Sequence, residues 1–182
     1  MFTINQDYKI IDAHTPVLTR QWDGKFEFMD CYFLEIIINS DDETMAKIKK
    51  LCAPFDYNTA VQYEISSRRF SHNVPRLFLL VGPNTIKNNF QDSDDFLALA
   101  LCLDLQNTTT IEYFEVNYKF RHSYEPNQKY RRVGTVVANA LQKLYQNREL
   151  YGHSALDAIK FWIKNGWSHI DEREQYLHWR HR

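Results

Sequence analysis

A basic segment ahead of one helix is the part of the sequence best suited to binding an anion. Lys129, Arg131 and Arg132 come just before Gly134, within the segment 129–136. The first turn of a helix has backbone N–H groups without intrahelical partners and carries partial positive charge. A glycine at that place lets a phosphate approach the backbone closely. The pattern predicts a phosphate site here, although a solvated helix terminus with basic neighbours has the same composition.

Two carboxylates lie close together on one predicted strand and are candidates for proton transfer. Glu112 and Glu115 both fall within the run 110–118, which is rich in aromatic and branched residues. Because side chains alternate between the two faces of a strand, positions three apart are predicted to point to opposite faces. Only one of the two can then face a cleft. Each can also be read as a solvated or salt-bridged strand carboxylate.

The elements that must position these residues follow from the hydrophobic pattern. The strongest helical periodicity covers 133–147, with the apolar stripe Val133, Val136, Val137, Ala140, Leu141, Leu144 and Tyr145. Before it, three runs bounded by turn signals predict an antiparallel meander at 76–81, 95–105 and 110–118. Alanine and leucine in the middle run favour a helix, but its position between two turns predicts a strand. Phe78, Leu80, Leu99, Leu101, Val137 and Leu141 are expected in the core.

The rest of the chain completes a mixed α/β pattern. Residues 16–38 are expected to form a hairpin around Asp23-Gly24, followed by helices from Ser40 to about Cys52 and from Thr59 to Arg69. After the main helix we expect a strand at 149–154, a helix at 155–165 and a closing hairpin at 167–171 and 175–179. Antiparallel strands followed by alternating elements predict one mixed sheet flanked by helices.

Composition excludes several classes of protein. The 182 residues fit a single domain, 1–182, and 44% are hydrophobic, which suffices for a sizeable core. The formal net charge of −1 argues against nucleic acid or a charged membrane as partner, despite Arg68-Arg69 and Arg131-Arg132. No apolar run approaches a membrane span and the N-terminus lacks signal-peptide features, so we expect a cytoplasmic protein.

Cysteine and histidine do not suggest a disulfide framework or a metal site. Cys31, Cys52 and Cys102 are far apart and odd in number, and each is best explained as a small buried hydrophobic residue. His178 and His181 have a spacing that can chelate a metal, but two ligands in a terminal tail rarely make a closed site. We therefore predict no metal.

Three segments, in this order, resemble the GNAT family of acyl-CoA N-acyltransferases. The strand 112–121 resembles the family's fourth strand, and 129–134 resembles its pyrophosphate loop. The segment 155–167 resembles the family's last conserved motif, with matches at Ala158, Phe161, Gly166 and Trp167. The good part of the resemblance covers about residues 76–171, and the first 75 residues match by element order only.

The resemblance implies a GNAT-like fold, a mixed and mostly antiparallel sheet flanked by helices. Residues 1–75 would form the acceptor side and 76–182 the cofactor-binding core. The implied activity is transfer of an acetyl or other acyl group from acetyl-CoA to a primary amine on a small molecule or a peptide. A homodimer is compatible with the resemblance, whereas no nucleic acid or membrane partner is expected.

The resemblance also assigns roles to individual residues. Coenzyme A would bind along the fourth strand and at the basic loop, where the implied contact residues are Val116, Lys129, Arg131, Arg132, Val133, Gly134, Thr135 and Phe161. A base must remove a proton from the acceptor ammonium, since alkyl amines have a pKa of about 10. Glu112 and Glu115 are the candidates, and Glu112 is favoured because its place resembles that of the acidic residue in some members.

The sequence departs from the family pattern at three places. Arg132 stands where the family usually has its first loop glycine, and residues 122–128 are an insertion ahead of the basic loop. Trp162 replaces a tyrosine that protonates the leaving thiolate in many members, and an indole N–H cannot act as that acid. A catalytically inactive GNAT-like module that binds coenzyme A or another protein is therefore the alternative.

Overall fold

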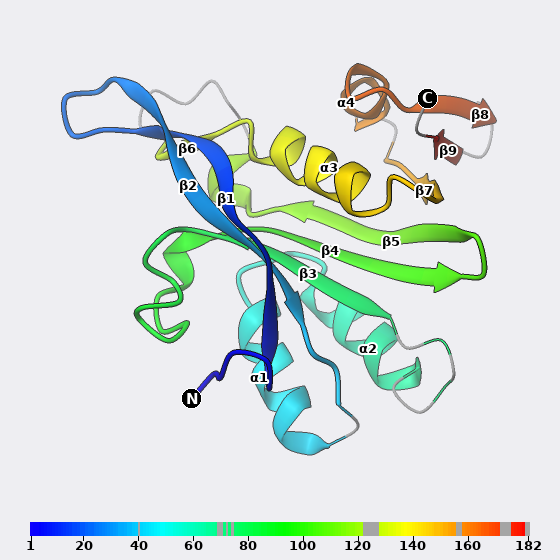
Figure 1. Ribbon diagram of the computed structural model, residues 1–182, viewed down its shortest axis with the longest axis horizontal. Coiled ribbons are helices and arrows are strands. Elements are labelled where there is room, and N and C mark those ends of the chain that lie inside the picture. The colour runs from blue at the N-terminus through cyan, green and yellow to red at the C-terminus, as the bar shows by residue number, and fades with distance from the viewer. Residues whose placement is uncertain are drawn as a thin grey trace.

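Helices cover both faces of one twisted sheet (Figure 1). The computed structural model describes residues 1–39, 41–68, 71, 73, 75–121, 128–155, 158–171 and 176–180. The described strands are β1 (Tyr8–Arg20), β2 (Phe26–Ile36), β3 (Arg76–Val81), β4 (Phe96–Leu105), β5 (Thr108–Val116), β6 (Tyr130–Arg131), β7 (Glu149–His153), β8 (Ser168–Asp171) and β9 (Tyr176–Trp179). The described helices are α1 (Asp42–Cys52), α2 (Asn58–Arg68), α3 (Val133–Leu144) and α4 (Ile159–Lys164), with 3₁₀ turns at Ser93–Asp95 and Tyr118–Phe120.

The sheet is mixed and mostly antiparallel, as the sequence predicts. Its strand order is β6-β1-β2-β3-β4-β5-β7-β9-β8. Every pairing along that order is antiparallel except that of β5 with β7, which is parallel. The connection between these parallel neighbours passes through α3, so this crossover helix leads from the basic loop to β7.

The sequence of the central strand β4 lacks alternation because the strand is buried on both faces. All residues from Phe96 to Leu103 are buried. One face of β4 packs under α3, and the other face packs over α1 and α2. A strand buried on both faces needs apolar residues at every position, which is why the Ala/Leu run is compatible with a strand. The predicted strand is confirmed.

Two hydrophobic cores result, one on each face of the sheet. Phe78, Leu80, Val137 and Leu141 belong to the core under α3 and α4, which also holds Trp162. The core on the other face lies against α1 and α2 and contains the remaining predicted residues Leu99 and Leu101. All six predicted core residues are buried. In the part of the chain that the structure describes, no helix is both long and apolar enough to span a membrane.

The predicted boundaries are correct in part. The helix predicted from Ser40 to Cys52 is confirmed as α1, where the Asp41 side chain accepts a hydrogen bond from the Thr44 N–H at 2.7 Å. Strand β1 begins at Tyr8, well before the predicted hairpin. This start was missed because bulges interrupt the alternation of the strand. Helix α4 is described from Ile159 to Lys164, within the predicted range, and the short strand β6 was not predicted.

Some of the predicted positions lie outside the described residues. They are Ser40, Arg69, residues 122–127 of the insertion, Leu156 and Asp157 in the predicted helix 155–165, Gln175 in the closing hairpin, and His181.

Candidate functional site

The site is built where two neighbouring strands separate. Strands β5 and β7 pair in parallel from Thr108↔Glu149 to Ile111↔Gly152, and the pairing stops there. Strand β5 continues to Val116 and remains paired with β4 on its other side. A fork therefore opens between β5 and the end of β7, under the start of α3 (Figure 1).

A cleft of about 1140 Å³ occupies this fork. It is lined by the second half of β5, the first turn of α3, the end of β7, and α4. Segments far apart in the sequence thus meet there. The cleft brings together every site residue predicted from the sequence except Lys129.

The first turn of α3 presents unpaired donors to the cleft. Among the described residues no side chain caps this helix, and its first internal hydrogen bond runs from the Val136 N–H to the Arg132 carbonyl at 3.1 Å. The N–H groups of Val133, Gly134 and Thr135 consequently have no intrahelical acceptor. All three residues line the cleft. Their N–H groups and the positive end of the helix suit an anion.

Gly134 is required by close packing. A Cβ built at this position would lie 3.1 Å from Phe161 Cε2 and 3.3 Å from Val116 Cγ2. These distances are shorter than ordinary van der Waals contacts, so a side chain here displaces one of the two neighbours. Val116 and Phe161, both predicted to contact the cofactor, therefore pack around the helix start.

The backbone conformation of Arg132 shows why the family usually has glycine at this position. Its backbone lies in the left-handed region, with φ 57° and ψ 23°. A residue with a Cβ adopts this region at a cost, whereas glycine does so freely. The loop therefore needs a positive φ where the family usually has glycine, and here the arginine supplies it under strain.

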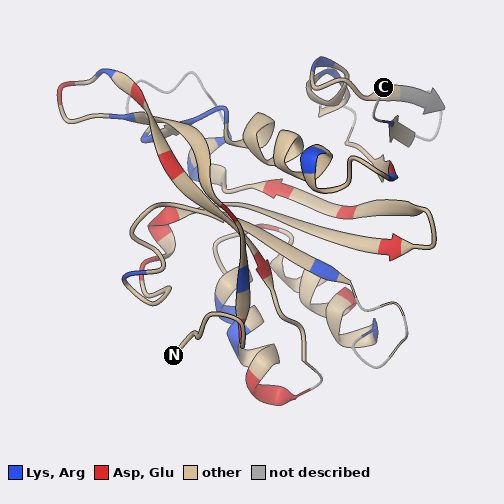
Figure 2. Ribbon diagram, viewed as in Figure 1, with Lys and Arg blue, Asp and Glu red and all other residues tan. Residues whose placement is uncertain are grey.

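The basic residues of the loop divide between two tasks. Arg131 and Arg132 line the cleft, and the Arg131 guanidinium lies 3.9 Å from the centre of the Phe26 ring. The buried Nε of Arg131 has no hydrogen-bond partner within the described chain. Figure 2 shows basic positions on the segment leading into α3 and acidic positions on β5.

Lys129 lies outside the cleft and anchors the loop. Its ammonium lies 2.5 Å from a carboxylate oxygen of the buried Asp95, which also accepts a hydrogen bond from the Tyr130 hydroxyl at 2.9 Å. Burial, reinforced by Asp95, raises the pKa of Tyr130 above its usual range. Asp95 and Tyr130 hold β6 to the 3₁₀ turn before β4, and no motif in the sequence indicated this role.

Glu115 is buried and fully occupied by structural contacts. Its carboxylate accepts hydrogen bonds from the backbone N–H of Asp56 at 2.7 Å and of Tyr57 at 3.0 Å, and it pairs with Arg121. Arg121 also lies 2.8 Å from the Asp56 carboxylate and donates to the Val116 carbonyl. Glu115 therefore ties the start of α2 to the end of β5.

Glu112 is in a different situation because of a β-bulge. Leu101 pairs with Tyr113 and Cys102 pairs with Ile111, so Glu112 is the extra residue on β5. The bulge shifts the alternation by one position and turns Glu112 toward the face that carries α2. The prediction that Glu112 and Glu115 point to opposite faces is thus wrong, since the alternation rule assumed a regular strand.

The surroundings of Glu112 favour its neutral form. Its side chain remains open to the cleft, but the neighbouring protein partly desolvates it and raises its pKa above the ordinary value. Glu64 of α2 adds to this effect, whereas Arg68 and His153 oppose it. In the described part of the chain, its carboxylate makes no hydrogen bond, in contrast to Glu115.

The floor of the cleft is aromatic. Trp162 is 7% exposed, and its ring lies 4.8 Å from that of Phe114, 5.1 Å from that of Phe161 and 4.9 Å from that of Trp167. The indole therefore packs into the hydrophobic core at the floor of the cleft.

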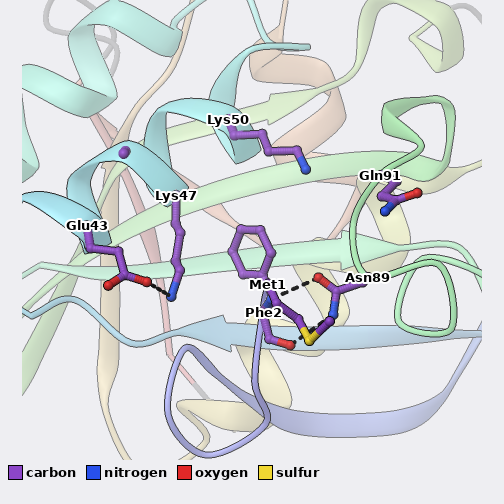
Figure 3. Close-up of a pocket in the computed structure, with 8 residues that line it drawn as sticks. Met1, Phe2, Glu43, Lys47, Lys50, Asn89 and Gln91 are labelled. Carbon is purple, nitrogen blue, oxygen red and sulfur yellow. Dashed lines mark hydrogen bonds and ion pairs between the residues drawn. The ribbon is translucent and has the colours of Figure 1, made fainter.

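A second hollow, of about 550 Å³, lies beside the N-terminal segment and α1 and is lined by Phe2 and Lys47 (Figure 3). The Lys47 ammonium pairs with Asp7 at 2.7 Å and with Glu43 at 2.9 Å. The Phe2 backbone is hydrogen-bonded to the Asn89 side chain. These contacts are structural, and the hollow holds none of the predicted site residues.

Comparison with known proteins gives the fold its name. No family model matches the sequence, and no curated protein matches it. The solved structure of Tetrahymena GCN5 is similar with a TM-score of 0.50 at 10% identity, over 85% of this chain and 97% of that chain. PaiA N-acetyltransferase from Thermoplasma acidophilum, solved in complex with coenzyme A, gives a TM-score of 0.43 at 11% identity, over 82% of this chain and 99% of that chain. The element order, the fork between β5 and β7 and the likeness to GCN5 identify the fold of this chain as the GNAT fold.

Proposed function

We propose that the protein is an N-acyltransferase that moves an acetyl group from acetyl-CoA to a primary amine. One observation carries the proposal: a single cleft holds an open helix N-terminus beside two arginines and, on strand β5, a carboxylate to which no described residue makes a hydrogen bond. The first feature suits a diphosphate and the second suits proton removal from an ammonium. The acceptor is a small molecule or a peptide that carries the amine.

The residues of the cleft fit coenzyme A. The N–H groups of Val133, Gly134 and Thr135 would hold the diphosphate, and Arg131 and Arg132 in the cleft lining would add positive charge beside it. Between Ile111 and Val116, the edge of β5 that faces β7 has lost its strand partner. An extended arm with amide groups can use such an edge for hydrogen bonds.

Glu112 is the residue of this chain best placed to act as the base. The thioester of the cofactor supplies an activated acyl group. The Glu112 carboxylate would take a proton from the acceptor ammonium, directly or through a water molecule, and leave a neutral amine. Its raised pKa makes it a stronger base than an ordinary glutamate. Glu115 would position the start of α2, because its oxygens are already engaged.

The chain offers no tyrosine at position 162 to protonate the departing thiolate. An ordinary thiol has a pKa of about 8.5, so a thiolate is an adequate leaving group without a strong acid. We therefore expect no falling limb at high pH from a tyrosine at this place.

Two measurements on the purified protein test the function. Calorimetric titration with acetyl-CoA should give saturable binding. A control titration with acetate and a nucleoside diphosphate should give much weaker binding. A panel of primary amines, assayed by release of the coenzyme A thiol, should contain at least one acceptor. Absence of acetyl-CoA binding by folded protein would refute the proposal.

A non-catalytic module that binds coenzyme A is the second candidate. The strained Arg132 in the phosphate loop and the buried Trp162 at the floor are the observations that favour it. Tight binding of coenzyme A, with no turnover of any amine in a broad panel, would select this reading.

A further inference from the structure

The fork places two titratable side chains from different strands next to each other. Ile111↔Gly152 is the last pair between β5 and β7, so Glu112 and His153 hold the next position on each strand. The bulge turns Glu112 toward the α2 face. Leu150 belongs to the core under α3, and alternation therefore puts His153 on the α2 face as well. Both side chains line the cleft.

The row continues onto the third strand. His153 of β7 is the register partner of Tyr176 of β9, and the two rings lie 4.8 Å apart. The charge of Glu112 reaches Tyr176 and, after burial, raises the pKa of that phenol. Glu112, His153 and Tyr176 thus form a row of carboxylate, imidazole and phenol across three strands.

We propose that His153 receives the reacting proton from Glu112 and releases it to bulk water. The inference rests on the proposed acyl transfer. His153 suits this task because it lines the cleft and its side chain is exposed to solvent. An imidazole gains and loses a proton near neutral pH, which is the property that a proton carrier between a carboxylate and water needs.

The acceptor ammonium gives one proton to a Glu112 oxygen, and the freed amine lone pair attacks the thioester carbonyl carbon. The new C–N bond forms and the C–S bond breaks, with the electron pair of that bond leaving on sulfur. The amide nitrogen loses its second proton to water. Glu112 passes its proton to the unprotonated nitrogen of His153, and the imidazolium then releases a proton to water, so both residues return to their starting state.

Other charged groups near Glu112 do not serve this role. Glu64 and Arg68 of α2 act on it, but these two side chains pair with each other. Tyr176 lies beyond His153 in the row, as its pairing with that residue shows. Among the described groups that act on Glu112, His153 is the one that lines the cleft.

Variants of His153 test the proposal through turnover. His153→Ala should lower kcat by about 10–100-fold, with little change in acetyl-CoA affinity or in thermal unfolding. Free imidazole added to the assay should restore part of the loss, because a diffusing base can replace the missing ring. The control is His178→Gln on β9, whose ring stacks on Tyr151 at 4.7 Å and does not line the cleft. A His153→Ala variant with full kcat, or a loss that imidazole does not rescue, would overturn the relay.

A second measurement does not depend on turnover. The carboxyl carbon of Glu112 can be followed by NMR during a pH titration, in the native protein and in His153→Gln. The imidazolium lowers the pKa of Glu112, so its removal should move the titration upward. An unchanged titration would refute the contact on which the relay depends. If the titration moves but the native protein turns over no amine, the proposed acyl transfer is refuted, and the relay with it. The electrostatic coupling of the two side chains would still stand.

Discussion

The two walls of the cleft treat their polar groups in opposite ways. On the α2 wall, the Glu115 carboxylate accepts two backbone N–H groups and pairs with Arg121, which in turn binds Asp56 and a backbone carbonyl. On the α3 wall, the first helical turn has no side-chain cap and the Nε of Arg131 has no partner in the described chain.

This difference separates structure from function within one site. Buried polar groups are normally satisfied, because an unmade hydrogen bond costs about 1–3 kcal/mol. A saturated cluster therefore stabilises the fold and has nothing left to offer a ligand. A wall whose donors stay unpaired gives up that stability, and a bound anion would recover it. Glu112, at the fork between the walls, belongs with the unsatisfied groups.

The largest effect is expected from Glu112→Gln, which keeps the shape of the side chain and removes the base. Turnover should fall by about 10²–10⁴-fold while acetyl-CoA affinity stays nearly unchanged. The native pH profile should rise with deprotonation of Glu112, at a pH above that of an ordinary glutamate because burial raises its pKa. Steady-state kinetics against pH would check both points. Full turnover by this variant on a true acceptor would move the role to water or to Glu115.

The stability of the same variant sharpens the contrast. Because the pKa of Glu112 is raised in the folded state, the folded protein holds this proton more tightly than the unfolded chain does. The stabilisation is fully present below the unfolded pKa and is lost as pH rises through the folded one. Glu112→Gln should therefore be at least as stable as the native protein at neutral pH, which denaturant unfolding would measure.

The next largest effect is expected on the α3 wall. Gly134→Glu places bulk against Phe161 and Val116 and a negative charge beside the diphosphate. Calorimetry should detect no acetyl-CoA binding, a loss of at least about 100-fold in Kd, equivalent to about 2.7 kcal/mol. Asn139→Glu, at an exposed position of α3, adds the same charge and should bind normally. Equal affinity in a folded Gly134→Glu variant would remove the phosphate site from this helix.

Much of the fold was predictable because its signals are local. The stripe of α3, the turns that bound β3, β4 and β5, and the cap of α1 all lie within short segments. The resemblance of the last third to a known family then supplied the arrangement of the sheet. The irregular start of β1 was missed because bulges break the alternation that predicts a strand.

The site was predictable in composition but not in geometry. Gly134 and the arginines could be found from their order along the chain. The roles of Glu115 and Lys129 could not, because their partners Asp56 and Asp95 are far away in the sequence. The bulge at Glu112 is a shift in the pairing of β5 with β4, and the sequence of β5 alone does not indicate it.

A smaller effect, on stability alone, is expected from the saturated wall. Glu115→Ala removes one partner of Arg121 and the acceptor of two backbone N–H groups, and should lower the free energy of unfolding by about 1–3 kcal/mol. Asp56→Asn removes only the exposed partner of Arg121 and should cost no more than about 1 kcal/mol. Denaturant unfolding compares them. A Glu115→Ala variant with native stability but without turnover would reassign Glu115 to catalysis.

The smallest effect is expected at Arg132, where the phosphate loop is strained. A residue with a Cβ pays about 1–2 kcal/mol for a left-handed backbone, and glycine avoids this cost but loses about 0.5–1 kcal/mol of chain entropy. Arg132→Gly should therefore stabilise the protein by about 0.5–1 kcal/mol. Arg132→Ala removes the same charge and keeps the strain, so the difference in unfolding free energy between the two variants isolates the backbone effect. The affinity of Arg132→Ala for acetyl-CoA, compared with that of the native protein, isolates the charge. If the glycine variant is no more stable than the alanine variant, the left-handed conformation at Arg132 does not strain the native fold. The phosphate loop would then lower the free energy of unfolding by less than its backbone geometry implies.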